Sequence, residues 1–355
     1  MLTYWLLFLV PAWLALAAPT RAQQPGKRWS AQWMLAWLLL TCIVGWRHEV
    51  GGDWVQYMAH YDEALTTPLA LAMSKGDPGY KLLLWAVTNL DWGVYAVNLA
   101  CGAVFSAGLV AFCRQQPRPW LALTVAIPYT VIVLGMGYTR QGVALGFAML
   151  GLVSLKQGRL LPFVAWVALG ATFHKSAVLL VPLAALATPR NRWWTAVWVG
   201  ATTVALYQTL LADSVDTLVA GYIDAGYQSE GAAVRVLMNV LPAMLLLWRR
   251  KHFNWTVPER NFWTMAAVLA LLSVVWLLVS PSSTAVDRLA LYLIPLQLYV
   301  FSRLPDVLGK RSDAKLMVRA VVGYYALVEA VWLLFATHAY AWLPYQFYPW
   351  IWLWE

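Results

Sequence analysis

Charged residues are scarce in this sequence, and that scarcity excludes a soluble globular fold. Only 12% of the 355 residues are charged and 61% are hydrophobic, whereas about 25% of the residues in a typical soluble domain carry charge. About 20 consecutive apolar residues are enough to cross a bilayer as a helix. Runs of this kind, nearly free of charge, recur at 92–112, 120–136, 193–211 and 316–337.

The alternation of apolar and polar residues that marks β-strands is also missing. A helix satisfies its own backbone hydrogen bonds inside a bilayer, so uninterrupted apolar runs predict helices. We expect an all-α polytopic membrane helix bundle with about twelve transmembrane helices, forming a single transmembrane domain over residues 1–355.

Cysteine is rare, and its spacing argues against disulfides and metal sites. Cys42, Cys101 and Cys113 are odd in number, show no CxxC spacing and fall within or at the ends of apolar runs, which is typical of core residues. The sequence contains no HExxH, DxD or Cys/His cluster. We therefore expect no metal and no other cofactor.

The placement of Lys and Arg predicts the orientation. Residues 2–18 lack the positive start of a secretory signal, and the cations that follow them favour a retained first span. Eighteen of the 25 Lys and Arg residues fall in one set of alternating loops, which we assign to the cytoplasm. Both termini and the long loops 47–91 and 212–235 then face outside. The net charge of +9 describes an inner face that meets anionic membrane lipids, and nucleic acid is not an expected partner.

The outer loop 47–91 contains two predicted short interfacial helices. Asp53 followed by Gln56 suits a helix N-cap and its N3 partner. Asp77 followed by Pro78 marks the start of the second helix.

Five outer cations lie near the ends of different predicted spans, where they could converge on one anionic group. Arginine forms a planar fork that matches phosphate oxygens. The alternative is that each cation extends to the lipid headgroups or pairs with a local carboxylate, as Arg288 could with neighbouring Asp287. The five are Arg47, Arg140, Lys175, Arg235 and Arg288.

Several short motifs occur in an order that is typical of one family. They are Arg47 with Val50-Gly51-Gly52-Asp53-Trp54 and Tyr57; Thr139-Arg140-Gln141-Gly142-Val143-Ala144; Phe173-His174-Lys175-Ser176-Ala177; Asp287-Arg288-Leu289-Ala290-Leu291-Tyr292; and Trp342-Leu343-Pro344-Tyr345. Together they resemble signatures of the EpsG family, the Wzy-like membrane polymerases of bacterial exopolysaccharide. Gly52 stands where members often have Thr or Ser, so a hydroxyl role at that position is absent.

This resemblance implies a multi-pass glycosyltransferase of the bacterial inner membrane, with a GT-C-like architecture and no metal. It would join polyprenyl-diphosphate-linked oligosaccharides, as donor and acceptor, on the periplasmic face. Other exopolysaccharide assembly proteins are further candidate partners. The same parts would serve an O-antigen-type ligase. A transporter or flippase is the alternative from another class, although such proteins often show internal repeats and charges at the bilayer midplane.

Three residues are candidates for acid/base work at an acceptor hydroxyl. Asp53 could remove its proton, although an N-cap role is the alternative. Glu49 is a second candidate, with a solvated loop carboxylate as its alternative. His174 lies at a predicted turn and could relay a proton or bind phosphate, or could simply satisfy that turn.

The remaining candidates would bind the diphosphate or the glycan beside the five cations. Gln141 could donate a hydrogen bond to a diphosphate or to a neighbouring helix. Tyr57 belongs to the first motif and Tyr292 to the fourth, and either could bind substrate or lie at the membrane interface. Gly142 and Gly146 form a G-x-x-x-G step that predicts close helix packing.

Overall fold

The computed structural model describes most of the chain. The described residues are 1–18, 29–73, 76–183, 192–208, 231–280, 282–308 and 313–354. Most of the predicted outer loop 212–235 lies outside these ranges.

The described part of the chain is mostly helical, as predicted, and it contains one short strand pair that the sequence did not indicate. In chain order the elements are α1 (Leu2–Ala17), α2 (Ala31–Gly45), β1 (Arg47–His48), α3 (Trp54–Thr66), α4 (Leu69–Met73), α5 (Pro78–Asn89), α6 (Gly93–Arg114), α7 (Pro119–Ala126), the π-helix η1 (Ile127–Gly135), α8 (Thr139–Lys156), α9 (Leu160–Ala171), the 3-10 helix η2 (Lys175–Leu180), α11 (Arg192–Leu206), α13 (Ala232–Arg249), η6 (Arg250–His252), α14 (Val257–Val279), α15 (Ser283–Ala290), η7 (Leu291–Leu293), α16 (Pro295–Phe301), α17 (Leu304–Val307), α18 (Ala314–Phe335), η8 (Ala339–Trp342), β2 (Gln346–Phe347) and α19 (Tyr348–Trp354).

Four helices of the described chain are long and apolar enough to cross a membrane. They are Gly93–Arg114, Ala232–His252, Val257–Val279 and Ala314–Phe335. Shorter apolar helices cover Leu2–Ala17, Ala31–Gly45, Pro119–Gly135 and Leu160–Ala171. The chain is thus an all-α protein with the helices of a membrane protein, but the predicted number of about twelve spans is not confirmed.

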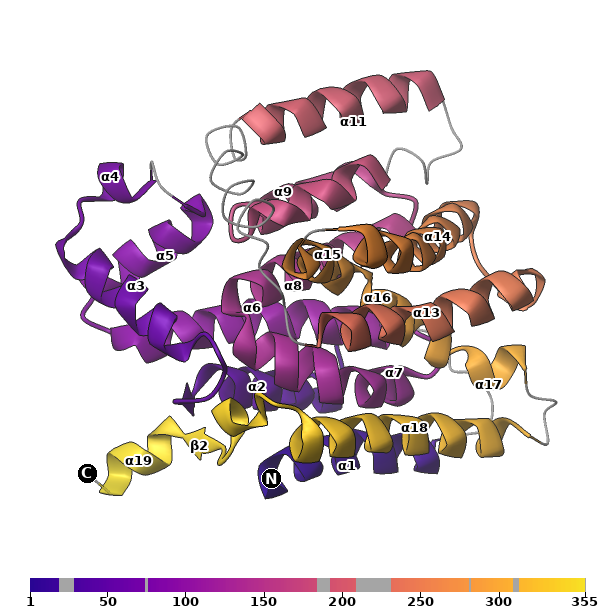
Figure 1. The fold of residues 1–355 in the computed structure, drawn as a ribbon, viewed down its shortest axis with the longest axis horizontal. Helices are drawn as coiled ribbons and strands as arrows, with labels where there is room; N and C mark the ends of the chain where they lie inside the picture. Colours follow the sequence, from indigo (N-terminus) through magenta and orange to yellow (C-terminus); the bar gives the residue numbers. More distant parts are fainter. Residues whose placement is uncertain are drawn as a thin grey trace.

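Helices α6 and α8 pack closely at the centre of the bundle (Figure 1). A Cβ atom at Gly108 of α6 would lie 2.0 Å from the carbonyl oxygen of Gly146 in α8, so both glycines are needed for this approach. A Cβ at Gly142 would meet nothing closer than 3.6 Å. The predicted glycine step is therefore confirmed for Gly146 and wrong for Gly142, because only Gly146 faces α6.

One end of the bundle gathers several short elements that are distant in sequence. The helices α3, α4 and α5 lie at the left of Figure 1, and β2 and α19 lie below them. Antiparallel pairing of β1 with β2 sets Arg47 opposite Phe347 and His48 opposite Gln346. The start of α8 also reaches this end, since Arg140 contacts both α3 and the start of α5. By the distribution of Lys and Arg, this is the end predicted to face outside.

Candidate active site

Arg140 is held at the start of α8 by two short helices, α3 and α5. Its Nη1 lies 2.9 Å from Oδ2 of Asp77, and its backbone N–H donates to the Tyr57 hydroxyl at 3.3 Å. The guanidinium carbon lies 5.9 Å from the Tyr80 ring centroid. The Nε atom of Arg140 is buried and has no hydrogen-bond partner among the described residues. Arg140 is therefore fixed in place but keeps an unused donor.

Asp53 occupies the N-cap position of α3, yet its side chain makes no capping hydrogen bond. The capping interaction with Gln56 as partner is thus wrong, although the predicted start of the helix is confirmed. Burial raises the pKa of Asp53, and the positive charges of Arg288, Arg140 and Arg47 offset that rise. Three of the predicted cations therefore act on one carboxylate, which accepts no hydrogen bond from the described part of the chain.

Arg47 is 1% exposed, and each of its three guanidinium nitrogens donates to an internal partner. It donates to the carbonyl oxygens of Val50 at 3.1 Å and Val44 at 2.5 Å, and to Oγ1 of Thr139 at 2.7 Å. These bonds join the end of α2 to the residue that precedes Arg140. The side chain thus contributes its charge to the site and fixes the backbone around it.

His174 lies in the turn between α9 and η2, beside two hydroxyl groups. The Ser176 Oγ lies 2.6 Å from His174 Nδ1 and 3.3 Å from the Tyr292 hydroxyl. Burial, followed by the charges of Arg140 and Arg288, lowers the pKa of His174 to about 3. At neutral pH the ring is therefore uncharged, which suits a hydrogen-bond role better than a proton relay.

Lys175 and Gln141 connect this turn and α15 to the same cluster. The backbone N–H of Lys175 donates to Asp77, and its charge acts on that carboxylate. Burial raises the pKa of Asp77, and Arg140 and then Lys175 offset the rise. Gln141 donates from Nε2 to the carbonyl oxygen of Arg288 at 2.7 Å. The sequence left two partners open for Gln141, a diphosphate or a neighbouring helix. In the described structure it bonds to a neighbouring helix, α15.

Arg235 forms a buried, two-bond ion pair with Asp287. Its Nε and Nη2 donate to the two carboxylate oxygens at 2.5 and 2.7 Å, and the two side chains are only 8% and 5% exposed. Asp287 immediately precedes Arg288, so this pair ties α13 to the segment that carries a predicted site arginine.

Glu49 is the predicted residue that the structure places at the rim. Its backbone has a φ of 50°, its side chain is 62% exposed, and its Oε1 lies 3.9 Å from Nε2 of His48. The contact is with His48 and not with an arginine. Glu49 is thus largely exposed, whereas Asp53 is affected by burial and by three arginine charges.

Two further residues belong to the cluster, and sequence reasoning missed both roles. Asp77 was interpreted only as a helix start, although an acidic residue among several predicted site cations is also a candidate ion-pair partner. Ser176 lies within the Phe173-His174-Lys175-Ser176-Ala177 motif, but its bond to the His174 ring depends on a turn that spacing alone does not predict.

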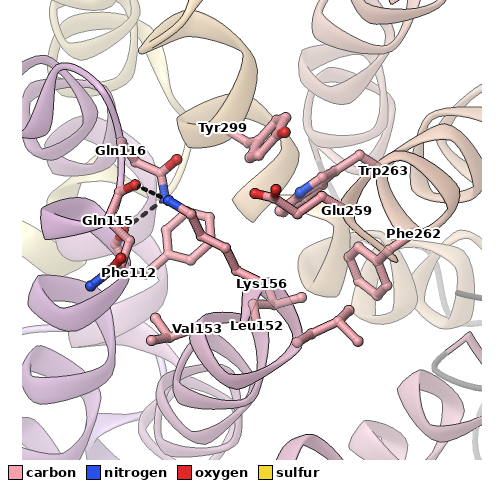
Figure 2. A pocket seen from close by; sticks show the side chains of 11 residues that line it. Phe112, Gln115, Gln116, Leu152, Val153, Lys156, Glu259, Phe262, Trp263 and Tyr299 are labelled. Carbon is pink, nitrogen blue, oxygen red and sulfur yellow. Dashed lines mark hydrogen bonds between the residues drawn. The ribbon is translucent and has the colours of Figure 1, made fainter. Parts of the chain in front are cut away.

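A pocket lies at the opposite end of the bundle. Lys156, the last residue of α8, and Glu259 in α14 enter it from different walls, among the rings of Phe112, Trp263 and Tyr299 (Figure 2). Lys156 lies sixteen residues after Arg140 in one helix, or about 24 Å along its axis. None of the predicted site residues lines this pocket.

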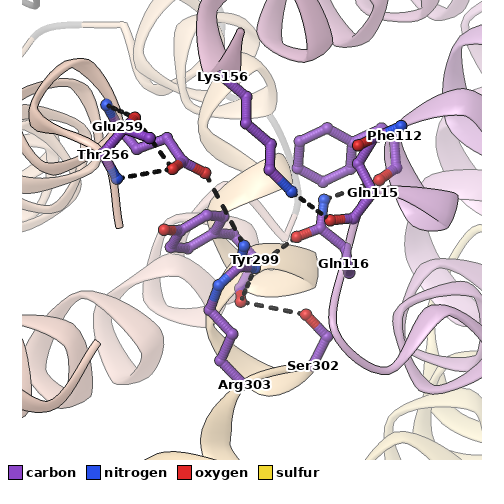
Figure 3. A network of polar contacts seen from close by, with 9 residues as sticks. All are labelled: Phe112, Gln115, Gln116, Lys156, Thr256, Glu259, Tyr299, Ser302 and Arg303. Atoms are coloured by element: carbon purple, nitrogen blue, oxygen red, sulfur yellow. Dashed lines mark hydrogen bonds and ion pairs between the residues drawn. The ribbon is translucent and has the colours of Figure 1, made fainter. Parts of the chain in front are cut away.

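The polar groups around this pocket largely bind one another (Figure 3). Lys156 Nζ donates to the Gln115 carbonyl at 2.6 Å. Glu259 caps its own helix through Thr256, and its Oε1 lies 4.0 Å from Nη2 of Arg303. These contacts join α8 and α14 to the residue that follows α6 and to the start of α17, which indicates a structural role.

The cluster around Asp53 and Arg140 is therefore the candidate active site. Among the residues that the structure describes, no group of three His, Cys, Asp or Glu side chains could hold a metal ion. A family model described as "EpsG family" matches residues 30–347. No curated protein and no solved structure matches the chain.

Proposed function

The chain belongs to the EpsG family, and on that basis we propose that it polymerises polyprenyl-diphosphate-linked oligosaccharide repeat units. Membership implies an exopolysaccharide polymerase-type membrane protein. The proposal adds the reaction, a metal-independent glycosyl transfer on the outer face of the inner membrane, and the carrier lipid. It also retains about twelve spans in a GT-C-like arrangement, with both termini outside.

One observation carries the proposal: Arg140 and Arg288 both act on Asp53, whose carboxylate accepts no hydrogen bond from the described residues. Arg140 pairs with Asp77, but its positive charge and that of Arg288 both favour an anionic ligand at this site. The buried and unpartnered Nε of Arg140 is a donor available to such an anion.

In the proposed reaction, the bond between the anomeric carbon of the donor sugar and a diphosphate oxygen breaks. The acceptor hydroxyl oxygen forms the new bond to that carbon and releases its proton to Asp53. Arg140 and Arg288, with Lys175 at the rim, neutralise the charge of the departing polyprenyl diphosphate. The uncharged His174 and the hydroxyls of its neighbours Ser176 and Tyr292 hold substrate oxygens by hydrogen bonds.

Four other candidate residues hold the reacting and charge-stabilising side chains in place. Arg47 joins the end of α2 to Thr139 and so fixes Arg140. Arg235 holds Asp287, and Gln141 holds the backbone of Arg288. Tyr57 accepts from the backbone of Arg140. Pre-positioned charges stabilise a transition state without reorganisation, and these contacts supply that rigidity.

The decisive experiment is extension of the native lipid-linked repeat by the purified protein in lipid nanodiscs, followed by product sizing. We expect long chains from the wild type and at least a hundredfold slower extension from Asp53→Asn, within the range of general-base effects of about 10² to 10⁴. Asp62→Asn, on the exposed side of the same helix, is the matched control and should retain wild-type turnover.

Two results would contradict the proposal. Transfer of a finished glycan to a different lipid, without extension of the repeat, would indicate a ligase. Wild-type turnover by a folded Asp53→Asn variant would remove Asp53 from the reaction.

A further inference from the structure

Four aromatic side chains from four elements meet beside the candidate active site. The Tyr95 and Tyr348 rings stack with centroids 3.5 Å apart. The Trp54 ring lies 6.0 Å from Tyr95 and 5.8 Å from the imidazole of His48. These residues come from α6, α19, α3 and β1, and all four are partly exposed. We call this group the outer aromatic cluster.

The cluster has polar groups at its edge. His48 Nδ1 forms a hydrogen bond with the Tyr95 hydroxyl, and His48 Nε2 lies 3.9 Å from the largely exposed carboxylate of Glu49. Glu49 has left-handed backbone geometry, with a φ of 50°, and a non-glycine residue in this region is uncommon. Flat apolar faces thus lie next to a carboxylate and an imidazole that can bind hydroxyl groups.

Backbone contacts hold the cluster in place. The pairing of β1 with β2 positions His48, and the backbone N–H of Tyr348 donates to the Trp46 carbonyl at 2.8 Å. Trp54 is the first residue of α3 and directly follows Asp53. The cluster is therefore held against the start of α3, at the residue that follows Asp53.

We propose that the outer aromatic cluster is a carbohydrate subsite that binds a pyranose unit of the oligosaccharide, an assignment that rests on the proposed function. The C–H face of a pyranose is apolar and packs against flat aromatic rings. Glu49 and His48 bind the hydroxyl groups around the sugar ring. Glu49 is then a glycan-binding residue, and Asp53 alone is the acid/base residue.

Packing against lipid is the competing explanation for exposed aromatic rings, since Trp and Tyr are enriched at membrane interfaces. An exposed carboxylate within the cluster opposes it, because charge is costly in an apolar environment. The adjacent helix α19 offers a comparison, since Trp350 and Trp352 are 70% and 67% exposed. Trp352, which makes no ring contact among the described residues, is the matched control.

The test measures binding without turnover. Purified full-length protein in nanodiscs is titrated with a lipid-free oligosaccharide, prepared by partial hydrolysis of the producing cell's own exopolysaccharide. We expect saturable binding by the wild type and about tenfold weaker binding, or about 1.4 kcal/mol, for Trp54→Ala and Tyr348→Ala. Trp352→Ala should bind as the wild type does. Glu49→Gln, a surface change that leaves the ring packing intact, should also weaken binding.

Absence of saturable binding by the wild type would overturn the subsite. It would equally be overturned if folded Trp54→Ala, Tyr348→Ala and Glu49→Gln all bound with wild-type affinity. Trp54→Phe should restore most of the binding affinity that Trp54→Ala loses. In extension assays, loss of an aromatic ring at this subsite should raise KM more than it lowers kcat. Glycan binding without any extension would reject the proposed polymerase activity and leave the subsite standing.

Discussion

Removing one partner of the Arg235–Asp287 pair should destabilise the protein far more than removing both. The pair has two bonds, at 2.5 and 2.7 Å, and both side chains are almost completely buried. Arg235→Met leaves a buried carboxylate without its guanidinium, and Asp287→Leu leaves the guanidinium without its carboxylate. The double variant replaces both charges with apolar side chains.

The expected magnitude follows from desolvation. Breaking a buried ion pair at one end typically costs about 3–5 kcal/mol, whereas replacing both ends by apolar residues is often neutral. A cost of 3 kcal/mol lowers the ratio of folded to unfolded protein by roughly a hundredfold. We expect each single variant to lose about 3 kcal/mol or more, and the double variant to lie within about 1 kcal/mol of the wild type.

The assay is a double-mutant cycle. Unfolding of each variant is measured in mixed detergent micelles and monitored by tryptophan fluorescence. If both single variants lose less than about 1 kcal/mol, as exposed pairs do, and the double variant is additive, the pair is not a buried structural contact. Extension of the lipid-linked repeat by the same variants separates two roles. Recovery of turnover in the double variant assigns Arg235 to positioning, whereas a stable but inactive double variant assigns it to the donor diphosphate.

Four further outcomes are expected. Arg140→Lys and Arg288→Lys keep the charge but lose the planar fork, so both should fold normally and extend the repeat at least about tenfold more slowly, corresponding to about 1.4 kcal/mol; wild-type rates for both would remove the diphosphate from this cluster. Because burial raises the pKa of Asp53, its carboxylate takes up a proton at a higher pH than an ordinary Asp. As the pH is lowered, turnover should therefore begin to fall at a higher pH than the pKa of an ordinary Asp would give. His174→Gln should leave that acid limb in place, since a ring with a pKa of about 3 does not titrate between about pH 5 and 8; a lost limb would assign it to His174. Finally, a cysteine at Glu49 should react with an impermeant thiol reagent on intact cells while one at Arg260 should not, and the reverse pattern would invert the orientation.

Hydropathy and helix-start signals predicted much of the fold because they depend on neighbouring residues. The charge-poor runs 92–112 and 316–337 correspond to Gly93–Arg114 and Ala314–Phe335. The starts of the two outer helices were predicted at Asp53 and Asp77, and both residues occupy N-cap positions. The run 120–136 was predicted as one span, but the structure divides it into α7 and the π-helix η1. Periodicity does not distinguish such a change of helix type.

The pairing of the site residues could not be read from the sequence. Asp77 and Arg140 are 63 positions apart, and Arg235 and Asp287 are 52 apart. Such partners are chosen by helix packing, which the local pattern does not encode. Asp53 shows the same limit of local sequence patterns. Its preference for helix N-caps predicts a capping side chain, whereas in the structure burial and three arginine charges act on its carboxylate. The family resemblance named these residues as candidates, but it gave none of the contacts between them.

The contacts between the two ends of the chain, beside the β1–β2 pair, place a requirement on biogenesis. The Tyr345 hydroxyl donates to the Ile43 carbonyl 302 positions earlier. Gly51, in the loop that leads to Asp53, donates through its backbone N–H to the Ala341 carbonyl. Early helices can enter the membrane during synthesis, since chains generally fold from the N-terminus first. The loop that leads to Asp53 therefore lacks its partner until Ala341 has been synthesised. We expect a chain that stops before Ala341 to form its helices but to leave this loop without that contact.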